Sequence, residues 1–428
     1  MLRRATTTAR LIPFLLGLGV CATPACVLAQ ELPRGTPEEV GLSSERLARV
    51  SEVFSGYADE GRMAGAVGMV VRHGKLAWVD AWGSRDVAEQ DPMQADDIFR
   101  IYSMTKPITS VAVMMLYEEG LFFLDDPVGR YLPELANLPV AKLAEATGPD
   151  DIPTERAARQ MTIRDLLRHT SGLTYGTFSN TAVDQLYRRD DVGNQTTLAD
   201  MVTALSDVPL AYHPGTTWNY SLSTDVLGRL VEVLSGQTFD AFLRERIFEP
   251  LGMDDTGFFV RPADRDRFAQ IYGHAGGRGG PLTLEAQETG GYTPEVTRFS
   301  GGGGLVSTAR DYSRFAQMLL NGGELDGYRI LSPTTIDLMT TDHLGDDGTS
   351  FLAPGWGFGL GFTIKNQPAL DGLPDSVGTY YWFGVAGTSF WIDPDRDLIG
   401  IFMIQIRPNR DVNFRDQFKR LVYQAVVD

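Results

Sequence analysis

Apolar residues change their spacing along this chain, and each change marks an expected element. Near the start, apolar positions three or four apart predict a helix that opens at Ser43-Ser44-Glu45 and stops around Gly61. Two strand-like runs, 66–72 and 76–82, flank a turn at 73–75 and predict a β-hairpin. Helical spacing then dominates from residue 101 to about 296. Further helices are expected at 103–119, 162–167, 223–234, 240–248, 308–320 and from 414 onward, and further strands at 357–364, 388–392 and 398–406.

Strands at both ends of the chain with helices between them predict an α/β fold with one antiparallel sheet built from both chain ends. The terminal helices are expected to cover this sheet, and the middle of the chain is expected to form a mainly helical insertion. We therefore expect an α/β part formed by residues 30–100 and 305–428, and a helical part formed by residues 101–304. The glycine run at 301–304 is expected to be a flexible joint before the next helix.

Composition places the chain among ordinary globular proteins. Of its 428 residues, 43% are hydrophobic and 22% are charged, which excludes a collagen-like, coiled-coil or disordered chain. The formal net charge is −17, from 38 basic and 55 acidic residues. Because an acidic protein repels phosphate backbones, nucleic acid is not an expected partner.

The first residues are expected to form a secretory signal peptide that covers residues 1–29. Arginines at positions 3, 4 and 10 precede an apolar stretch at 11–22, and Val27-Leu28-Ala29 ends in the small residue typical of a cleavage site. The stretch is short for a membrane span, and Pro13 interrupts it. We therefore predict a periplasmic or secreted protein that keeps no stable membrane anchor after cleavage, exported by either the Sec or the twin-arginine route.

Both cysteines, Cys21 and Cys26, fall inside the expected signal peptide. Cleavage after Ala29 would leave a chain without a disulfide, a cysteine nucleophile or a thiolate metal site. The histidines show no His-Glu-x-x-His or similar grouping, so neither a metal nor a cofactor is expected. No complete Gly-x-Ser-x-Gly occurs, which disfavours an α/β-hydrolase.

The sharpest chemical signal is Ser103-Met104-Thr105-Lys106. Pro107 is tolerated near a helix start, so this helix is expected to begin close to Ser103. The residues that follow are apolar nearly all round, which is typical of a buried central helix. Residues three apart share a helical face, so Lys106 Nζ is expected to reach Ser103 Oγ. Burial near a positive helix end would lower the lysine pKa and let it take the serine proton. Alone, a Ser-x-x-Lys tetrapeptide also occurs by chance.

Two further segments supply context for this pair. Tyr220 lies in the loop 218–221, just before a predicted helix. A phenol there, near Lys106, could take part in proton transfer together with the lysine. The run 382–387, Trp-Phe-Gly-Val-Ala-Gly, enters a predicted strand. Glycine there lets the backbone approach a ligand closely, and strand N–H groups could form an oxyanion hole. Alternatively, Tyr220 is an ordinary packed side chain, and the run 382–387 is a bulge in a hairpin.

In this order, the segments resemble the serine β-lactamase and penicillin-binding-protein superfamily, and most closely the class C-like branch that includes the family VIII carboxylesterases. The resemblance covers nearly the whole chain after the signal peptide. It also includes Leu-Leu-Arg-His-Thr-Ser-Gly-Leu at 166–173, the glycine run leading into 305–309, and Trp-Ile-Asp-Pro at 391–394. It implies a β-lactamase/transpeptidase-like fold.

The resemblance also implies a role for each matching residue. Ser103 matches the acylated serine and Lys106 its partner base. Tyr220 matches the tyrosine of the Tyr-x-Asn motif, which helps to activate the serine and to protonate the leaving group. Residues 382–384 occupy the Lys-Thr-Gly position. The oxyanion hole would be formed by the backbone N–H groups of Ser103 and Val385.

Two departures from the family pattern bear on the substrate. Leu222 stands where a β-lactamase has the asparagine that binds the substrate amide, and Trp382 stands where it has the lysine that attracts a carboxylate. Together with Gly384, these residues are expected to contact the substrate. The departures predict weak β-lactam turnover. With an aromatic residue at the lysine position, the chain resembles the esterase branch. We therefore expect a serine hydrolase that cleaves small neutral carboxylic esters.

Other functions stay open on the sequence. A β-lactamase, or a peptidase or amidase acting on D-amino-acid peptides, would use the same serine chemistry. A catalytically inactive ligand-binding module could keep the fold, although the retention of Ser103, Lys106 and Tyr220 argues against it. His169, beside Ser171, is expected to support structure rather than to form a Ser–His pair.

Overall fold

The computed structural model describes residues 31–276, 279–285, 291–345, 352 and 354–428. The expected signal peptide at 1–29, with both cysteines, lies outside these described residues. Among the helices that the structure describes, none is both long and apolar enough to cross a membrane.

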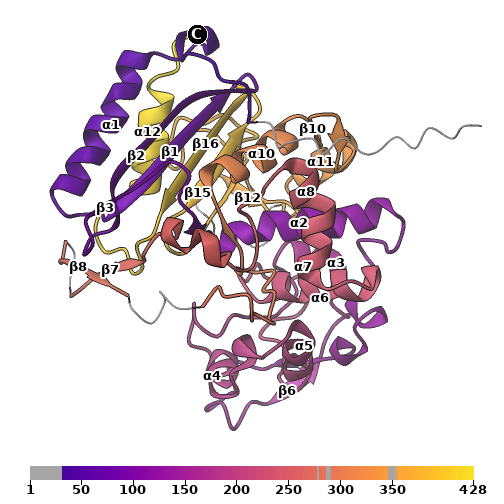
Figure 1. The fold of residues 1–428 in the computed structure, drawn as a ribbon. Helices are drawn as coiled ribbons and strands as arrows, with labels where there is room; N and C mark the ends of the chain where they lie inside the picture. The colour runs from indigo at the N-terminus through magenta and orange to yellow at the C-terminus, as the bar shows by residue number, and fades with distance from the viewer. Residues whose placement is uncertain (1–30, 277–278, 286–290, 346–351, 353) are drawn as a thin grey trace, which may run out of the picture.

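The centre of the described fold is an eight-stranded antiparallel sheet in the order β12-β13-β14-β15-β16-β1-β2-β3 (Figure 1). Strand β1 pairs with β16, from Ala66 opposite Ile404 to Arg72 opposite Leu398. Strands from the two ends of the chain therefore lie side by side, and the expected sheet built from both chain ends is confirmed. In chain order the strands are β1 (Gly65–Arg72), β2 (Lys75–Asp86), β3 (Asp91–Pro92), β12 (Trp356–Phe358), β13 (Thr363–Lys365), β14 (Tyr380–Phe383), β15 (Ser389–Asp393) and β16 (Leu398–Ile404).

Helices flank this sheet and fill the space beside it (Figure 1). The α-helices are α1 (Ser44–Asp59), α2 (Thr105–Glu118), α3 (Ile163–Leu167), α4 (Ala182–Arg189), α5 (Leu198–Ser206), α6 (Ser223–Ser235), α7 (Phe239–Leu243), α8 (Glu249–Leu251), α10 (Ala309–Leu320), α11 (Pro333–Met339) and α12 (Phe414–Tyr423). Short strands pair outside the large sheet: β4 (Phe99–Arg100) with β9 (Val306–Ser307), β5 (Pro139–Ala141) with β6 (Thr154–Arg156), β7 (Tyr272–His274) with β8 (Leu282–Leu284), and β10 (Glu324–Leu325) with β11 (Tyr328–Arg329).

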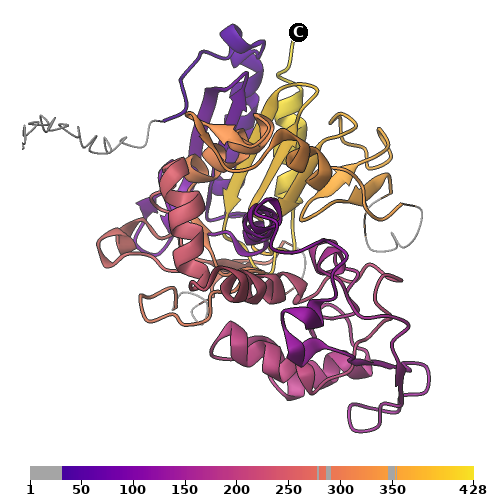
Figure 2. The same ribbon diagram turned by 90° about the vertical axis from the view of Figure 1, so that its right-hand side faces the viewer.

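Neighbouring side chains of β1 enter two separate cores, as the two-residue period of a strand requires. Val67 packs into the larger core, whereas Ala66 packs into the smaller one. Helices α1 and α12 cover the face with the smaller core, so segments from the two ends of the chain close the same side of the sheet (Figure 1). Figure 2 shows the strands from the two chain ends, indigo and yellow, side by side in the sheet. Helices α2 and α10 contribute their apolar side chains to the larger core on the opposite face.

Some expected elements differ in detail from the structure. The single strand expected at 357–364 is two strands, β12 and β13, because Gly361 adopts φ +102° and turns the chain between them. The helix expected from Ser103 begins with a 3₁₀ turn, Tyr102–Met104, and continues as α2. Where the chain divides into a part formed by 30–100 with 305–428 and a part formed by 101–304 stays a prediction.

The glycine run at 301–304 is a packed turn, not the flexible joint that its composition suggested. A Cβ added to Gly301 would lie 2.5 Å from the Thr224 carbonyl oxygen, and one added to Gly302 would lie 2.3 Å from Asp225 Oδ2. The start of α6 therefore presses directly against this backbone. Glycine is required here for close approach, so the run positions its peptide groups firmly.

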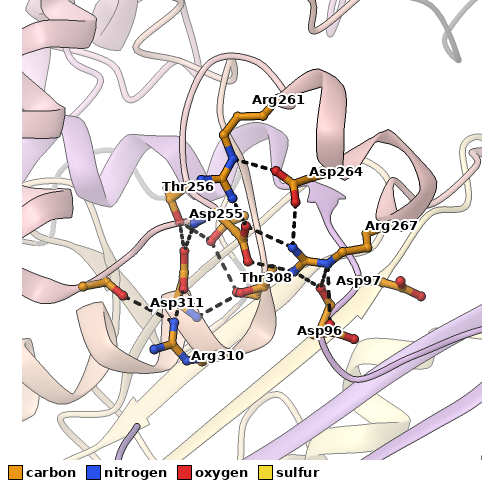
Figure 3. A network of polar contacts seen from close by, with 12 residues as sticks. Asp96, Asp97, Asp255, Thr256, Arg261, Asp264, Arg267, Thr308, Arg310 and Asp311 are labelled. Carbon is orange, nitrogen blue, oxygen red and sulfur yellow. Dashed lines mark hydrogen bonds and ion pairs between the residues drawn. The ribbon is translucent and has the colours of Figure 1, made fainter. Parts of the chain in front are cut away.

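A polar network holds the start of α10 (Figure 3). The Asp311 carboxylate accepts hydrogen bonds from Asp255 N (2.8 Å) and Thr256 Oγ1 (3.0 Å). Thr308 Oγ1 caps the helix by accepting the Asp311 N–H at 3.1 Å. Arg267 extends the network through an ion pair with Asp255 at 2.7 Å. Burial raises the pKa of Asp311 to about 6, against the opposing effect of its hydrogen bonds.

This network fixes β9 and, through β9, the segment that precedes Ser103. Gly257 and Val306 exchange backbone hydrogen bonds of 3.2 and 2.8 Å beside the network. Strand β9 pairs with β4, and the next residue, Ile101, donates its N–H to the Leu305 carbonyl at 3.1 Å. The chain that leads into Ser103 is thus held before the α2 helix begins.

Candidate active site

Ser103 lies in a tight turn at the start of a buried helix. The preceding residue, Tyr102, has φ +43°, a left-handed conformation that costs of order 1 kcal/mol for a residue with a side chain. The side chains of residues 105–116 are all buried, as their apolar sequence predicts. Ser103 itself is partly exposed, because the turn directs it out of the helix and into a cavity.

Lys106 is 2% exposed, and its amine meets three oxygen atoms. Lys106 Nζ lies 3.3 Å from Ser103 Oγ, 2.8 Å from Tyr175 Oη and 2.6 Å from the Gly302 carbonyl oxygen. Burial lowers the lysine pKa to about 7, and the Asp225 carboxylate opposes this shift. A large fraction of Lys106 is therefore a neutral amine at neutral pH, as the buried helix start predicted.

Tyr220 lies on the other side of the serine. Its phenol donates a hydrogen bond to Ser103 Oγ at 2.6 Å. Burial raises the Tyr220 pKa above its ordinary value, and the hydrogen bond with Ser103 opposes this shift. The loop before it is fixed to the segment at 169–173, because the Asn219 N–H donates to the His169 carbonyl at 2.8 Å. Tyr220 is therefore a protonated phenol, held ready to donate a proton.

His169 serves this loop and does not pair with the serine beside it. Its side chain is buried, and its Nδ1 lies 3.3 Å from Ser221 Oγ. Its ring centroid lies 4.9 Å from that of Tyr220. Burial, followed by the charge of Lys106, keeps the His169 pKa well below its usual value. A neutral imidazole thus packs behind the tyrosine.

Sequence reasoning missed two groups that complete the site. Tyr175 and the Gly302 carbonyl both contact Lys106, although they lie 69 and 196 residues away in the chain. Tyr175 follows the His-Thr-Ser-Gly-Leu segment by two residues, and Gly302 lies inside the glycine run. Burial raises the Tyr175 pKa well above its usual value, so its phenol also stays protonated.

The turn between β14 and β15 brings Val385 to the same cavity as Ser103. A Cβ added to Gly384 would lie 2.2 Å from Thr388 Oγ1 and 2.6 Å from the Ile101 carbonyl oxygen. Gly384 therefore lies close to the segment that leads into Ser103, and its expected contact with the substrate stays a prediction. The glycine lets that segment and the turn touch, and both Ser103 and Val385 line the same cavity. The oxyanion role of their N–H groups stays a prediction.

The two departures from the β-lactamase pattern occupy different places. Leu222 is buried and lines the cavity, and its contact with the substrate stays a prediction. Trp382 is 4% exposed, and its ring packs against Tyr220 and Phe358 at centroid distances of 5.5 and 5.3 Å. The indole thus supports Tyr220 from behind, and the expected contact of Trp382 with the substrate stays a prediction.

The cavity beside Ser103 has a volume of about 790 Å³. Aromatic and aliphatic side chains line it together with charged side chains, among them those of Arg188, Arg298 and Arg407. Lining residues include Ser103, Tyr175, Phe178, Leu222, Tyr292 and Val385. A cavity of this size and composition fits a small organic molecule.

Comparison with known proteins agrees with this geometry. A family model described as Beta-lactamase matches residues 50–424. The chain belongs to the beta-lactamase family. Esterase EstB from Burkholderia gladioli is 34% identical over 372 residues, which cover 81% of this chain and 87% of that protein. Protein Rv1367c from Mycobacterium tuberculosis is 41% identical over 372 residues, which cover 83% of this chain and 89% of that protein.

Among solved structures, the chain is similar to EstCE1, described as a hydrolase with promiscuous acyltransferase activity. The TM-score is 0.73 at 26% identity, and the match covers 90% of this chain and 98% of that one. The fold expectation is thereby confirmed. The protein is a serine hydrolase of the beta-lactamase family, related to esterases.

Proposed function

We propose that this serine hydrolase cleaves small neutral carboxylic esters through an acyl-enzyme on Ser103. The observation that carries the proposal is the position of Ser103 Oγ, which lies within hydrogen-bonding reach of both Lys106 Nζ and Tyr220 Oη. One neighbour is a buried amine with a lowered pKa, and the other is a protonated phenol. A nucleophile between a base and an acid is the arrangement that acyl transfer requires.

The hydrogen bonds of Lys106 direct its lone pair. A neutral amine has two N–H bonds and one lone pair. The Gly302 carbonyl can only accept, so it takes one N–H at 2.6 Å, and Tyr175 Oη accepts the second at 2.8 Å. The lone pair then faces Ser103 Oγ. Both neighbours of Lys106 that sequence reasoning missed thus orient the base.

The reaction follows from these positions. Lys106 takes the Ser103 proton as Oγ bonds to the ester carbonyl carbon, and the carbonyl oxygen becomes an oxyanion facing the N–H groups of Ser103 and Val385. The bond to the alkoxy group then breaks. Tyr220 gives its proton to the departing alkoxide, and the proton held by Lys106 restores Tyr220. Water hydrolyses the acyl-enzyme in a second, equivalent cycle.

The absence of a lysine at position 382 and of an asparagine at 222 supports neutral esters as the substrate class. The aromatic and aliphatic side chains that form part of the cavity lining, and the similarity to Esterase EstB, point the same way. The test compares kcat/KM for p-nitrophenyl butyrate, nitrocefin and a D-amino-acid anilide on the purified protein. A higher value for the butyrate supports an esterase. A higher value for nitrocefin or the anilide would replace it with a β-lactamase or a peptidase, and no turnover would favour a binding module.

We also propose that the protein is periplasmic or secreted after removal of residues 1–29. The arginines at 3, 4 and 10, followed by a short apolar stretch, support this. Expression of the full chain in a Gram-negative host, followed by fractionation and N-terminal sequencing, tests it. An N-terminus at Gln30 in the periplasm or medium is expected. An intact N-terminus in the cytoplasmic fraction would overturn the proposal.

A further inference from the structure

Asp225 is a buried acid beside the catalytic cluster that the mechanism above does not use. It lies in the first turn of α6 and is 3% exposed. Its Oδ1 accepts hydrogen bonds from Ser300 Oγ and from the Gly302 N–H, the latter at 3.2 Å. Among the residues that the structure describes, no arginine or lysine forms an ion pair with it. A buried carboxylate held by neutral donors needs a functional or structural reason.

Gly302 connects this carboxylate to the base. Its N–H donates to Asp225, and its carbonyl oxygen accepts from Lys106 Nζ at 2.6 Å. A Cβ at position 302 would lie 2.3 Å from Asp225 Oδ2, so the contact depends on glycine. One residue thus joins a fixed negative charge to the amine that receives the serine proton.

We propose that Asp225 is a positioning residue for Lys106, acting through Gly302. Its carboxylate fixes the carbonyl that orients the amine, and its charge favours the ammonium that forms when Lys106 takes the serine proton. The proposal rests on the acyl-enzyme function of Ser103 and extends it to a residue outside the serine, lysine and tyrosine set.

The other titratable groups around Lys106 are neutral, so Asp225 supplies the negative charge that favours its ammonium form. Ser103 comes from the turn before α2, Tyr175 and His169 from the segment after α3, and Tyr220 from the loop before α6. Burial keeps both tyrosines protonated and His169 neutral. Asp225 raises the Lys106 pKa, against the larger lowering by burial. Its charge therefore keeps the buried amine more basic than burial alone would.

The test is the pH dependence of kcat/KM in Asp225→Asn, with a neutral nitrophenyl ester. Asparagine keeps an oxygen acceptor for Ser300 and Gly302 but removes the charge. The acid limb of the profile should move to lower pH by about one unit, because the ammonium loses its favourable neighbour. The plateau of kcat should fall several-fold with little change in KM. An acid limb at the wild-type position would overturn the proposal.

A matched control separates this effect from the general cost of removing a buried acid. Asp393 is fully buried in β15 and accepts a hydrogen bond from Tyr423 Oη at 2.7 Å, away from the cavity. Asp393→Asn should lower Tm and leave the acid limb in place. If Asp225→Asn does not fold, Asp225→Ser carries the same expectation. Failure of the Ser103 mechanism can be told apart from failure of the Asp225 proposal, because the wild-type protein itself would then show no acid limb of kcat/KM near neutral pH.

Discussion

The activity of the protein should rise with pH through the pKa of Lys106, which is about 7. Burial lowers this pKa from its ordinary value, so the neutral amine predominates above pH 7 and the ammonium below it. At this pKa, about 9% of Lys106 is neutral at pH 6 and about 91% at pH 8. If the neutral amine is the base, kcat/KM should therefore increase about tenfold between these two values.

The assay is the initial rate of p-nitrophenyl butyrate hydrolysis at low substrate, followed at the isosbestic wavelength of nitrophenol and at constant ionic strength. Asp311 titrates in the same window, because burial raises its pKa to about 6. Asp311→Asn should therefore keep the acid limb, as should Lys142→Ala, which changes an exposed lysine paired with Glu145. A flat profile from pH 6 to 8 in wild type would refute the role of Lys106 as a neutral base.

Three substitutions test other parts of the account. Lys106→Arg should reduce kcat as much as Lys106→Ala, by roughly three orders of magnitude or more, because guanidinium keeps its proton; near-wild-type turnover would contradict this. Trp382→Ala should lower stability by about 3–5 kcal/mol and kcat with it, since the indole packs behind Tyr220. Thermal unfolding and saturation kinetics measure both, and a change in KM alone would restore the direct substrate contact. Gly384→Ala should lower Tm and activity, because its Cβ would lie 2.6 Å from the Ile101 carbonyl oxygen; unchanged activity would argue against the packed turn.

The parts of the site that sequence could predict depend on local geometry. Ser103 and Lys106 lie three residues apart at a helix start, so helical spacing alone brings their side chains together, and the observed distance is 3.3 Å. Local geometry was not enough to identify Tyr220, because it lies in a loop and only the family resemblance assigns it a role. Tyr175 and Gly302 had no local signal, since each meets Lys106 through packing between segments distant in the chain.

In the fold, too, some elements could be predicted from local sequence and others could not. Strands β1, β2 and β16 were predictable because strand-like, largely apolar runs ended at clear turns. The turn between β12 and β13 was hidden, since apolar residues continue through it and its one requirement is the left-handed Gly361. The orientation of Trp382 was hidden for a related reason. Strand β14 reads Tyr-Tyr-Trp-Phe, so its buried and half-buried positions alternate without any change in side-chain character.

Ser103 is the residue that we propose becomes acylated. Labelling the protein with a fluorophosphonate, followed by proteolysis and peptide mass analysis, tests this directly. We expect a single adduct on the peptide that contains Ser103. We expect no adduct in a folded Ser103→Ala variant, whose turnover should fall by several orders of magnitude. An adduct on a different serine, or unchanged labelling of the variant, would contradict the account.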